Sequence, residues 1–122
     1  IGMVKNGEFE ACTNEIAMLR EATKGHILKV IIETCYLTEE EKIKMCELVT
    51  SAGADFIKTS TGFSTGGATV EAVETLKRFS QGMQVKASGG IRTLAEAEAM
   101  LKAGADRIGA SAGVEIIREL EV

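Results

Sequence analysis

The eleven residues Ala52-Gly-Ala-Asp-Phe-Ile-Lys-Thr-Ser-Thr-Gly62 recur as Ala103-Gly-Ala-Asp-Arg-Ile-Gly-Ala-Ser-Ala-Gly113, with seven of the eleven positions identical. Each copy has the same order: the end of a helix, a glycine stop, a short strand, and a loop of small residues. Repetition of such a unit is typical of stacked βα units. The two copies therefore predict a chain of alternating strands and helices.

The remaining segments extend this pattern in both directions. Capping boxes at Thr38/Glu41 and Thr93/Glu96 each open a predicted helix, and Gly53 and Gly104 end these two helices. Further helices are expected at 8–23, from Val70 onward, and at 113–122. Short runs of apolar and β-branched residues predict four strands, at 26–33, 54–60, 84–87 and 106–110. Strands that alternate with helices imply a parallel sheet, so the expected fold class is α/β.

Side-chain alternation separates two possible architectures. Each predicted strand has aliphatic residues on one face and at least one charge on the other, for example Ile57 against Lys58 and Val85 against Lys86. An open doubly wound sheet would bury five such charges under helices, at a cost of several kcal/mol for each unpaired one. A (β/α)8 barrel avoids this cost because the charges face its interior. The alternation favours half of a TIM barrel, with residues 1–122 as a single partial domain.

Four strands cannot close such a barrel alone. Either about half of the polypeptide is missing from the N-terminal side, or two copies pair, or the piece opens with its polar face in water. Residue 1 is Ile rather than Met, so the numbered chain is expected to begin inside a longer polypeptide. Exposed sheet edges favour self-association, so a homo-oligomer is expected.

Composition excludes several classes of function. No apolar run is long enough for a membrane span, and a net charge of −4 is unsuited to general nucleic-acid binding. Three cysteines without a C-x-x-C pair, and one histidine, do not make a zinc site or a disulfide framework, so we expect no metal and a reducing cytoplasm.

Lys58 and Lys86 are the main candidates for chemistry. They have the same parity on neighbouring strands, which lie about 4.8 Å apart. Burial and a nearby cation both lower the pKa of a lysine, and a neutral lysine is a nucleophile for carbonyls. A structural ion pair between Lys58 and Glu33 is the competing interpretation of Lys58 taken alone.

Three glycine-bearing loops, 61–62, 88–90 and 111–113, follow successive strands at the same end of the predicted sheet. Loops rich in backbone N–H groups at helix starts bind phosphate, so together they predict a phosphate site. Arg92 either joins this site or is a solvated residue at a helix start. Cys35 is expected to be an inert thiol, and His26 a surface residue.

The segments 29–35, 52–63, 85–93 and 104–111 closely resemble deoxyribose-phosphate aldolase, and the resemblance runs the length of the chain. It implies the C-terminal half of a class I aldolase of deoxyribonucleotide catabolism, without metal or cofactor. That enzyme reversibly cleaves 2-deoxy-D-ribose 5-phosphate to D-glyceraldehyde 3-phosphate and acetaldehyde.

The resemblance also assigns roles to individual residues. Lys58 forms the Schiff base, Lys86 lowers its pKa and assists proton transfer, and the phosphate is held by Gly62, Gly89, Gly90 and Ser111. Two departures stand out: Ala112 replaces a serine of the family, and the family's catalytic aspartate lies just before Ile1. The competing hypothesis is a non-catalytic, self-associating half-barrel that at most binds phosphate esters.

Overall fold

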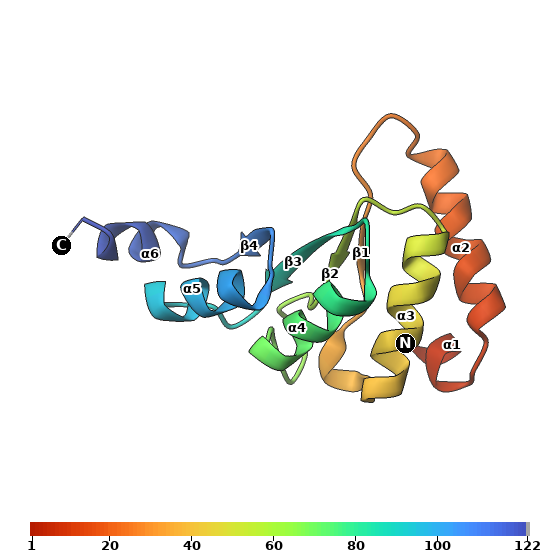
Figure 1. The fold of residues 1–122 in the computed structure, drawn as a ribbon, viewed down its shortest axis with the longest axis horizontal. Coiled ribbons are helices and arrows are strands. Elements are labelled where there is room, and N and C mark those ends of the chain that lie inside the picture. Colours follow the sequence, from red (N-terminus) through yellow and green to blue (C-terminus); the bar gives the residue numbers. More distant parts are fainter. Residues whose placement is uncertain (122) are drawn as a thin grey trace.

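Strands and helices alternate along the chain in the computed structural model, which describes residues 1–121 (Figure 1). The four strands form one parallel sheet in the order β1-β2-β3-β4, so each strand pairs with the next in sequence. The elements are α1 (Gly2–Lys5), α2 (Phe9–Ala22), β1 (Lys29–Ile31), the 3-10 turn η1 (Thr34–Tyr36), α3 (Glu39–Ser51), β2 (Phe56–Lys58), α4 (Val70–Phe79), β3 (Gln84–Ser88), α5 (Leu94–Ala103), β4 (Arg107–Gly109) and α6 (Gly113–Glu119). The predicted α/β class with four parallel strands is confirmed.

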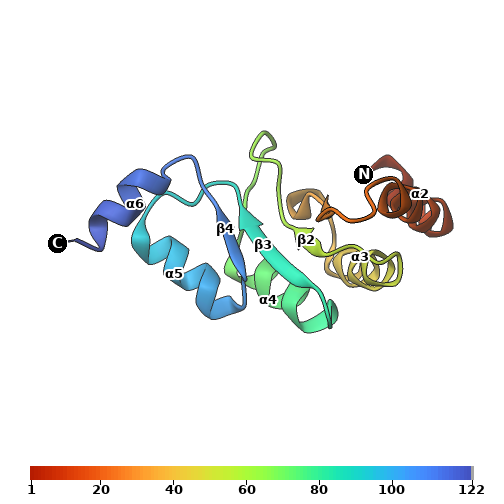
Figure 2. The same ribbon diagram turned by 90° about the horizontal axis from the view of Figure 1, so that it is seen from above.

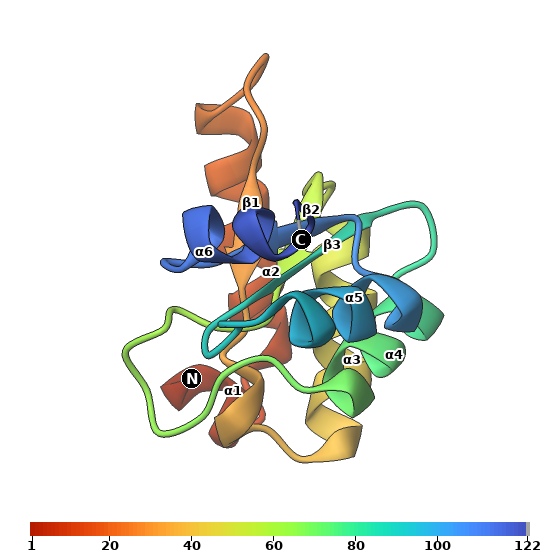
Figure 3. The same ribbon diagram turned by 90° about the vertical axis from the view of Figure 1, so that its left-hand side faces the viewer.

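Helices α3, α4 and α5 follow one another along one side of the sheet (Figures 2 and 3). Helix α2 packs on α3 and α6 packs on α5, so these two helices flank opposite ends of the row. Ile57 and Val85 are fully buried, while Lys58 and Lys86, one residue further along each strand, are half-buried on the opposite face. The predicted alternation of aliphatic and charged faces is therefore confirmed.

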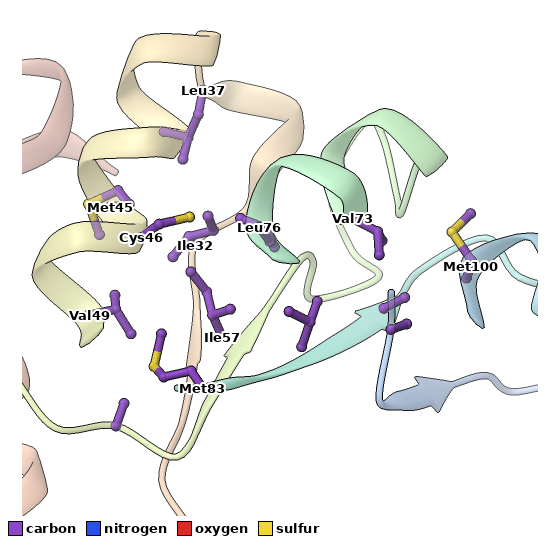
Figure 4. Close-up of a cluster of buried hydrophobic side chains, with 14 of the residues drawn as sticks. Ile32, Leu37, Met45, Cys46, Val49, Ile57, Val73, Leu76, Met83 and Met100 are labelled. Carbon is purple, nitrogen blue, oxygen red and sulfur yellow. The ribbon is translucent and has the colours of Figure 1, made fainter. Parts of the chain in front are cut away.

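The core lies between the sheet and this helical layer. Figure 4 shows Ile32 and Ile57 from the sheet side meeting Cys46 and Val49 of α3 and Leu76 of α4. Each helix contributes apolar residues spaced by three or four, which is the spacing of a single helix face. The opposite face of the sheet is covered by none of these three helices.

Both predicted capping boxes are formed. The Thr38 and Thr93 hydroxyls accept the N–H groups of Glu41 and Glu96, whose carboxylates bond back to the backbone N–H of the capping threonine. Gly104 ends α5 with φ +117°, in the left-handed region that glycine adopts without strain.

The aspartate of the sequence repeat makes equivalent contacts in both copies. Asp55 accepts the backbone N–H of Leu28 at 2.8 Å and pairs with Arg20 at 2.6 Å. Asp106 accepts the N–H of Val85 at 2.9 Å and pairs with Lys77 at 3.1 Å. Each aspartate thus joins the start of its own strand to the preceding strand and to a cation from a helix.

The structure also corrects several predicted boundaries. Three strands are shorter than expected, with three residues each in β1, β2 and β4, whereas β3 extends to Ser88. The short helix α1 and the turn η1 were not predicted from the sequence. Helix α6 ends at Glu119, and the last residue of the predicted 113–122 helix lies outside the described residues.

Candidate active site at the carboxyl ends of the strands

A cavity of about 400 Å3 lies where β2, β3 and β4 end. Its lining includes five of the six residues predicted from the sequence to form the site, namely Lys58, Gly62, Gly89, Gly90 and Ser111. The cavity forms here because parallel strands all end at the same edge of the sheet. The three glycine-bearing loops that follow them are thereby brought together, as predicted.

Several residues that line the cavity have backbone N–H groups without a hydrogen-bond partner in the described part of the chain. Within residues 1–121, the amides of Gly62, Gly89, Gly90 and Ser111 donate no hydrogen bond. Unpaired amides that border a solvent-filled cavity are suited to binding an anion. Glycine at three of these positions allows a ligand to approach the backbone closely.

Buried hydroxyl groups hold the turn after β3 in place. The Thr59 hydroxyl donates to the Ser88 carbonyl at 3.0 Å and accepts the Ser88 N–H at 3.1 Å. The Ser88 hydroxyl donates to the Ser60 carbonyl at 2.7 Å. These bonds tie the ends of β2 and β3 together and fix the position from which Gly89 and Gly90 project.

Glu33 anchors the loop after β2. This role of Glu33 was not predicted from the sequence. Its carboxylate oxygens accept the Thr61 N–H at 3.2 and 3.3 Å, and the residue is 5% exposed. Its φ of 55° places it in the left-handed region, unusual for a residue other than glycine. Among the described residues Glu33 makes no ion pair with Lys58, so the competing ion-pair interpretation is wrong.

Lys58 and Lys86 are register partners in the β2–β3 ladder. Lys58 lines the cavity, whereas Lys86 lies beside it, packed against Gly109. A Cβ at position 109 would lie 2.8 Å from Lys86 Cε, so the missing side chain of Gly109 leaves space for this lysine. The pKa of Lys86 is lowered, first by burial, which removes water from the ammonium group, and then by the neighbouring cations Lys58, Lys29 and Arg107.

These four cations and Phe56 share the face of the sheet opposite α3, α4 and α5, which we call the cation face. Lys29 and Arg107 lie over the ring of Phe56, at 5.5 and 5.0 Å from its centroid. In the part of the chain that the structure describes, none of the four cations pairs with a carboxylate. The cation face therefore carries positive charge that no carboxylate within residues 1–121 neutralises.

The weaker candidates are placed as follows. Arg92 borders the cavity, and its backbone N–H donates to Glu96 at 2.7 Å. Cys35 is an exposed free thiol with the Thr65 hydroxyl 3.9 Å from its sulfur. His26 is exposed, as predicted. Cys12 and Cys46 are buried free thiols, and burial raises the pKa of each.

Within residues 1–121, no three His, Cys, Asp or Glu side chains are grouped so that they could hold a metal ion. No helix in the same range has the length and apolar character to cross a membrane.

A parallel α/β sheet with a lysine and an amide-lined cavity at the carboxyl ends of its strands has the layout of phosphate-binding α/β enzymes. The sequence profile of the DeoC/LacD family aldolases matches residues 2–119. The chain belongs to this family.

Individual relatives agree with this assignment. The deoxyribose-phosphate aldolase of Caldanaerobacter subterraneus subsp. tengcongensis is 54% identical over 98% of this chain, and that of Carboxydothermus hydrogenoformans is 55% identical over 98%. Among solved structures, an aldolase named QR15 has a TM-score of 0.92 at 45% identity over 98% of this chain. A tetrameric deoxyribose phosphate aldolase from Aeropyrum pernix has a TM-score of 0.87 at 35% identity over 93%.

The chain spans about half the length of the relatives it matches. It covers 53% and 55% of the two curated relatives, and 55% and 50% of the two structures.

Proposed function

We propose that this chain is half of a class I aldolase that cleaves 2-deoxy-D-ribose 5-phosphate to D-glyceraldehyde 3-phosphate and acetaldehyde. The observation that carries the proposal is the position of Lys58, which lies beside the cation Lys86 and lines a cavity of unpaired amides. An amine nucleophile and an anion site in one cavity suit a substrate with both a carbonyl and a phosphate. The relatives' names and the family assignment support the same activity.

The proposed reaction begins when the neutral amine of Lys58 attacks the substrate carbonyl carbon. Loss of water gives a protonated imine. The bond between C2 and C3 then breaks as the C3 hydroxyl loses its proton, and the electron pair moves toward the imine to form an enamine. Release of glyceraldehyde 3-phosphate, protonation of the enamine carbon and hydrolysis of the imine give acetaldehyde and regenerate Lys58.

Lys86 has a supporting role in this proposal. It is the register partner of Lys58, and its own lowered pKa allows it to exchange a proton during the reaction. The amides of Gly62, Gly89, Gly90 and Ser111 bind the phosphate. Ala112 supplies no hydroxyl, so backbone groups carry most of this binding.

The remaining catalytic groups are assigned to the other half of a barrel. We infer that the four strands are the C-terminal half of a (β/α)8 barrel, because the chain superposes on about half of two aldolase structures. The unpaired charges of the cation face would then be neutralised by carboxylates of the other half, including the aspartate expected before Ile1. Like the Aeropyrum relative, the complete protein is expected to be an oligomer.

Trapping the imine tests the proposal. The full-length protein that carries this chain is incubated with acetaldehyde and sodium borohydride, and its peptides are analysed by mass spectrometry. We expect an ethyl group on Lys58 and no trapping in Lys58→Arg, while Lys29→Arg, a matched change on the same face, keeps the adduct. An adduct on another lysine, or none on the wild-type protein, would overturn the Schiff-base role.

A self-associating half-barrel is the second candidate, favoured by apolar side chains at the surface. Ile31 is 42% exposed on the cation face, and Val114 and Ile117 of α6 are more than half exposed. Pairing through the cation face would bring like charges together, which is unfavourable. Sedimentation velocity of the 122-residue chain tests this candidate: a monomer at every concentration excludes it.

A further inference from the structure

Gly67, in the loop between β2 and α4, touches the turn that follows β3. A Cβ at position 67 would lie 2.5 Å from the carbonyl carbon of Gly89 and nearer still to its oxygen. The N–H of Ala68 donates to that same oxygen at 3.0 Å. The absence of a side chain at position 67 therefore brings two separate loops into direct backbone contact.

Gly89 has little freedom to move away from this contact. Its φ is +91°, and a Cβ there would lie 3.1 Å from Gly67 Cα and 3.3 Å from Ser60 Cβ. Ser60 is fully buried, and its carbonyl accepts the Ser88 hydroxyl bond that anchors the turn. Gly89 is thus packed between Gly67 and Ser60.

The same contact lies beside residues that line the cavity. Gly62 lies in the same loop as Gly67, and its Cα lies 3.7 Å from the position of a Cβ on Gly89. Loop and turn both line the 400 Å3 cavity, and they also enclose a second space of about 200 Å3 beside Arg92. Moving either segment to accommodate a methyl group at position 67 separates the Gly62 amide from those of Gly89 and Gly90.

We propose that Gly67 is a positioning residue that sets phosphate affinity by holding the Gly62 and Gly89–Gly90 amides at the distance one phosphate group spans. The proposal rests on the proposed function in taking the phosphate ester as the ligand of this cavity. Gly67 itself does not line the larger cavity, so its effect is indirect. Its φ lies outside the left-handed region, so alanine at this position acts through contact rather than through backbone conformation.

The test compares phosphorylated and unphosphorylated substrate in full-length Gly67→Ala protein. We expect the KM for 2-deoxyribose 5-phosphate to rise about tenfold or more, as for the loss of hydrogen bonds to a charged group. The kcat for that substrate, and the rate with 2-deoxyribose, should stay within about twofold of wild type. Gly2→Ala is the matched control, because a Cβ there has no neighbour within 4 Å.

Inorganic phosphate gives a readout independent of catalysis. Phosphate should raise the Tm of the wild-type protein and of Gly2→Ala, and raise that of Gly67→Ala much less. If Gly67→Ala does not fold, the double variant Ser60→Gly/Gly67→Ala replaces it. Loss of the Ser60 Cβ gives the turn at Gly89 room to shift. We expect the same loss of phosphate affinity in the double variant.

The possible outcomes separate this inference from the proposed function. An unchanged KM and an unchanged phosphate effect in Gly67→Ala overturn the inference, and so does an equal loss of rate with both substrates, which marks a merely structural role. A protein that neither traps acetaldehyde nor cleaves the ester, yet loses phosphate stabilisation in Gly67→Ala, overturns the proposed function and supports the inference.

Discussion

Lys58 and Lys86 face each other across the β2–β3 ladder, and neither pairs with a carboxylate within residues 1–121. Burial and three neighbouring cations hold the pKa of Lys86 below its ordinary value of 10.5. Two half-buried like charges side by side destabilise the charged form of the folded chain. The arrangement therefore lowers the stability of the folded chain while Lys86 is charged.

Replacement of Lys86 by methionine should reveal this cost. Between the lowered pKa of Lys86 and 10.5 the unfolded chain binds more protons than the folded chain, so wild-type stability rises with pH in that window. Lys86→Met lacks this contribution. We expect the variant to be more stable than wild type near neutral pH, with the difference shrinking as the pH approaches 10.5.

Urea unfolding of the 122-residue chain at several pH values measures this difference. Lys24→Met changes an exposed lysine away from the cation face and serves as the control. A stability difference between Lys86→Met and wild type that does not vary with pH would contradict the expected linkage.

Asp55 stabilises the folded chain when it is charged, whereas charged Lys86 destabilises it. The pKa of Asp55 is lowered by the Leu28 N–H bond and by Arg20, so its contribution to stability is present above its ordinary pKa of 3.8 and is lost as the pH falls through its lowered value. Asp55→Asn should be less stable than wild type at pH 7 and approach it in acid. Thermal unfolding from pH 7 to pH 2 measures this, and a deficit that persists undiminished at the acid end would be inconsistent with it.

Features encoded within a few residues could be predicted from the sequence. The capping boxes at Thr38 and Thr93 depend only on residues three positions apart, and both form as expected. The gathering of the glycine loops follows from parallel strand order alone. Strand ends could not be predicted, because they depend on the neighbouring strand: Ser88 belongs to β3 since it pairs with Gly109.

The residues that support the site could not be predicted from the sequence, because their contacts also depend on distant parts of the chain. Glu33 reaches Thr61 through a left-handed backbone conformation that its sequence neighbours do not indicate. The contact of Gly67 with Gly89 joins two loops whose approach depends on the whole sheet. Such contacts arise from tertiary packing, whereas Lys58 could be identified from strand parity.

Gly104 provides a test of the predicted helix stop. Alanine there must adopt φ near +117°, and its Cβ would lie 2.6 Å from Lys77 Cγ. We expect Gly104→Ala to lower the free energy of unfolding by about 1–2 kcal/mol, the cost of a left-handed conformation. Gly2→Ala, which meets neither constraint, should differ little from wild type in the same urea titration. Equal stabilities for the two variants would be evidence against a conformational role of Gly104.

Phe56 occupies an unusual position, because a ring that is only 3% exposed lies beneath two cations on the face of the sheet not covered by α3, α4 and α5. Two effects therefore stabilise it, burial of the ring and attraction of Lys29 and Arg107 to its π face. Leucine at this position retains much of the burial and removes the π face. A comparison of Phe56→Leu with Phe56→Ala separates the two effects.

A double-mutant cycle between Phe56→Leu and Arg107→Met then measures the attraction itself. We expect a coupling of about 0.5–1 kcal/mol in urea unfolding, since Arg107 loses its interaction in either single variant and the double variant loses it only once. Phe56→Ala should cost about 3–5 kcal/mol because it also leaves a cavity. A cycle of Phe56→Leu with Lys24→Met, which lies away from the ring, is expected to show no coupling. If the Phe56→Leu/Arg107→Met cycle shows no more coupling energy than the Phe56→Leu/Lys24→Met cycle, Arg107 covers Phe56 without stabilising it.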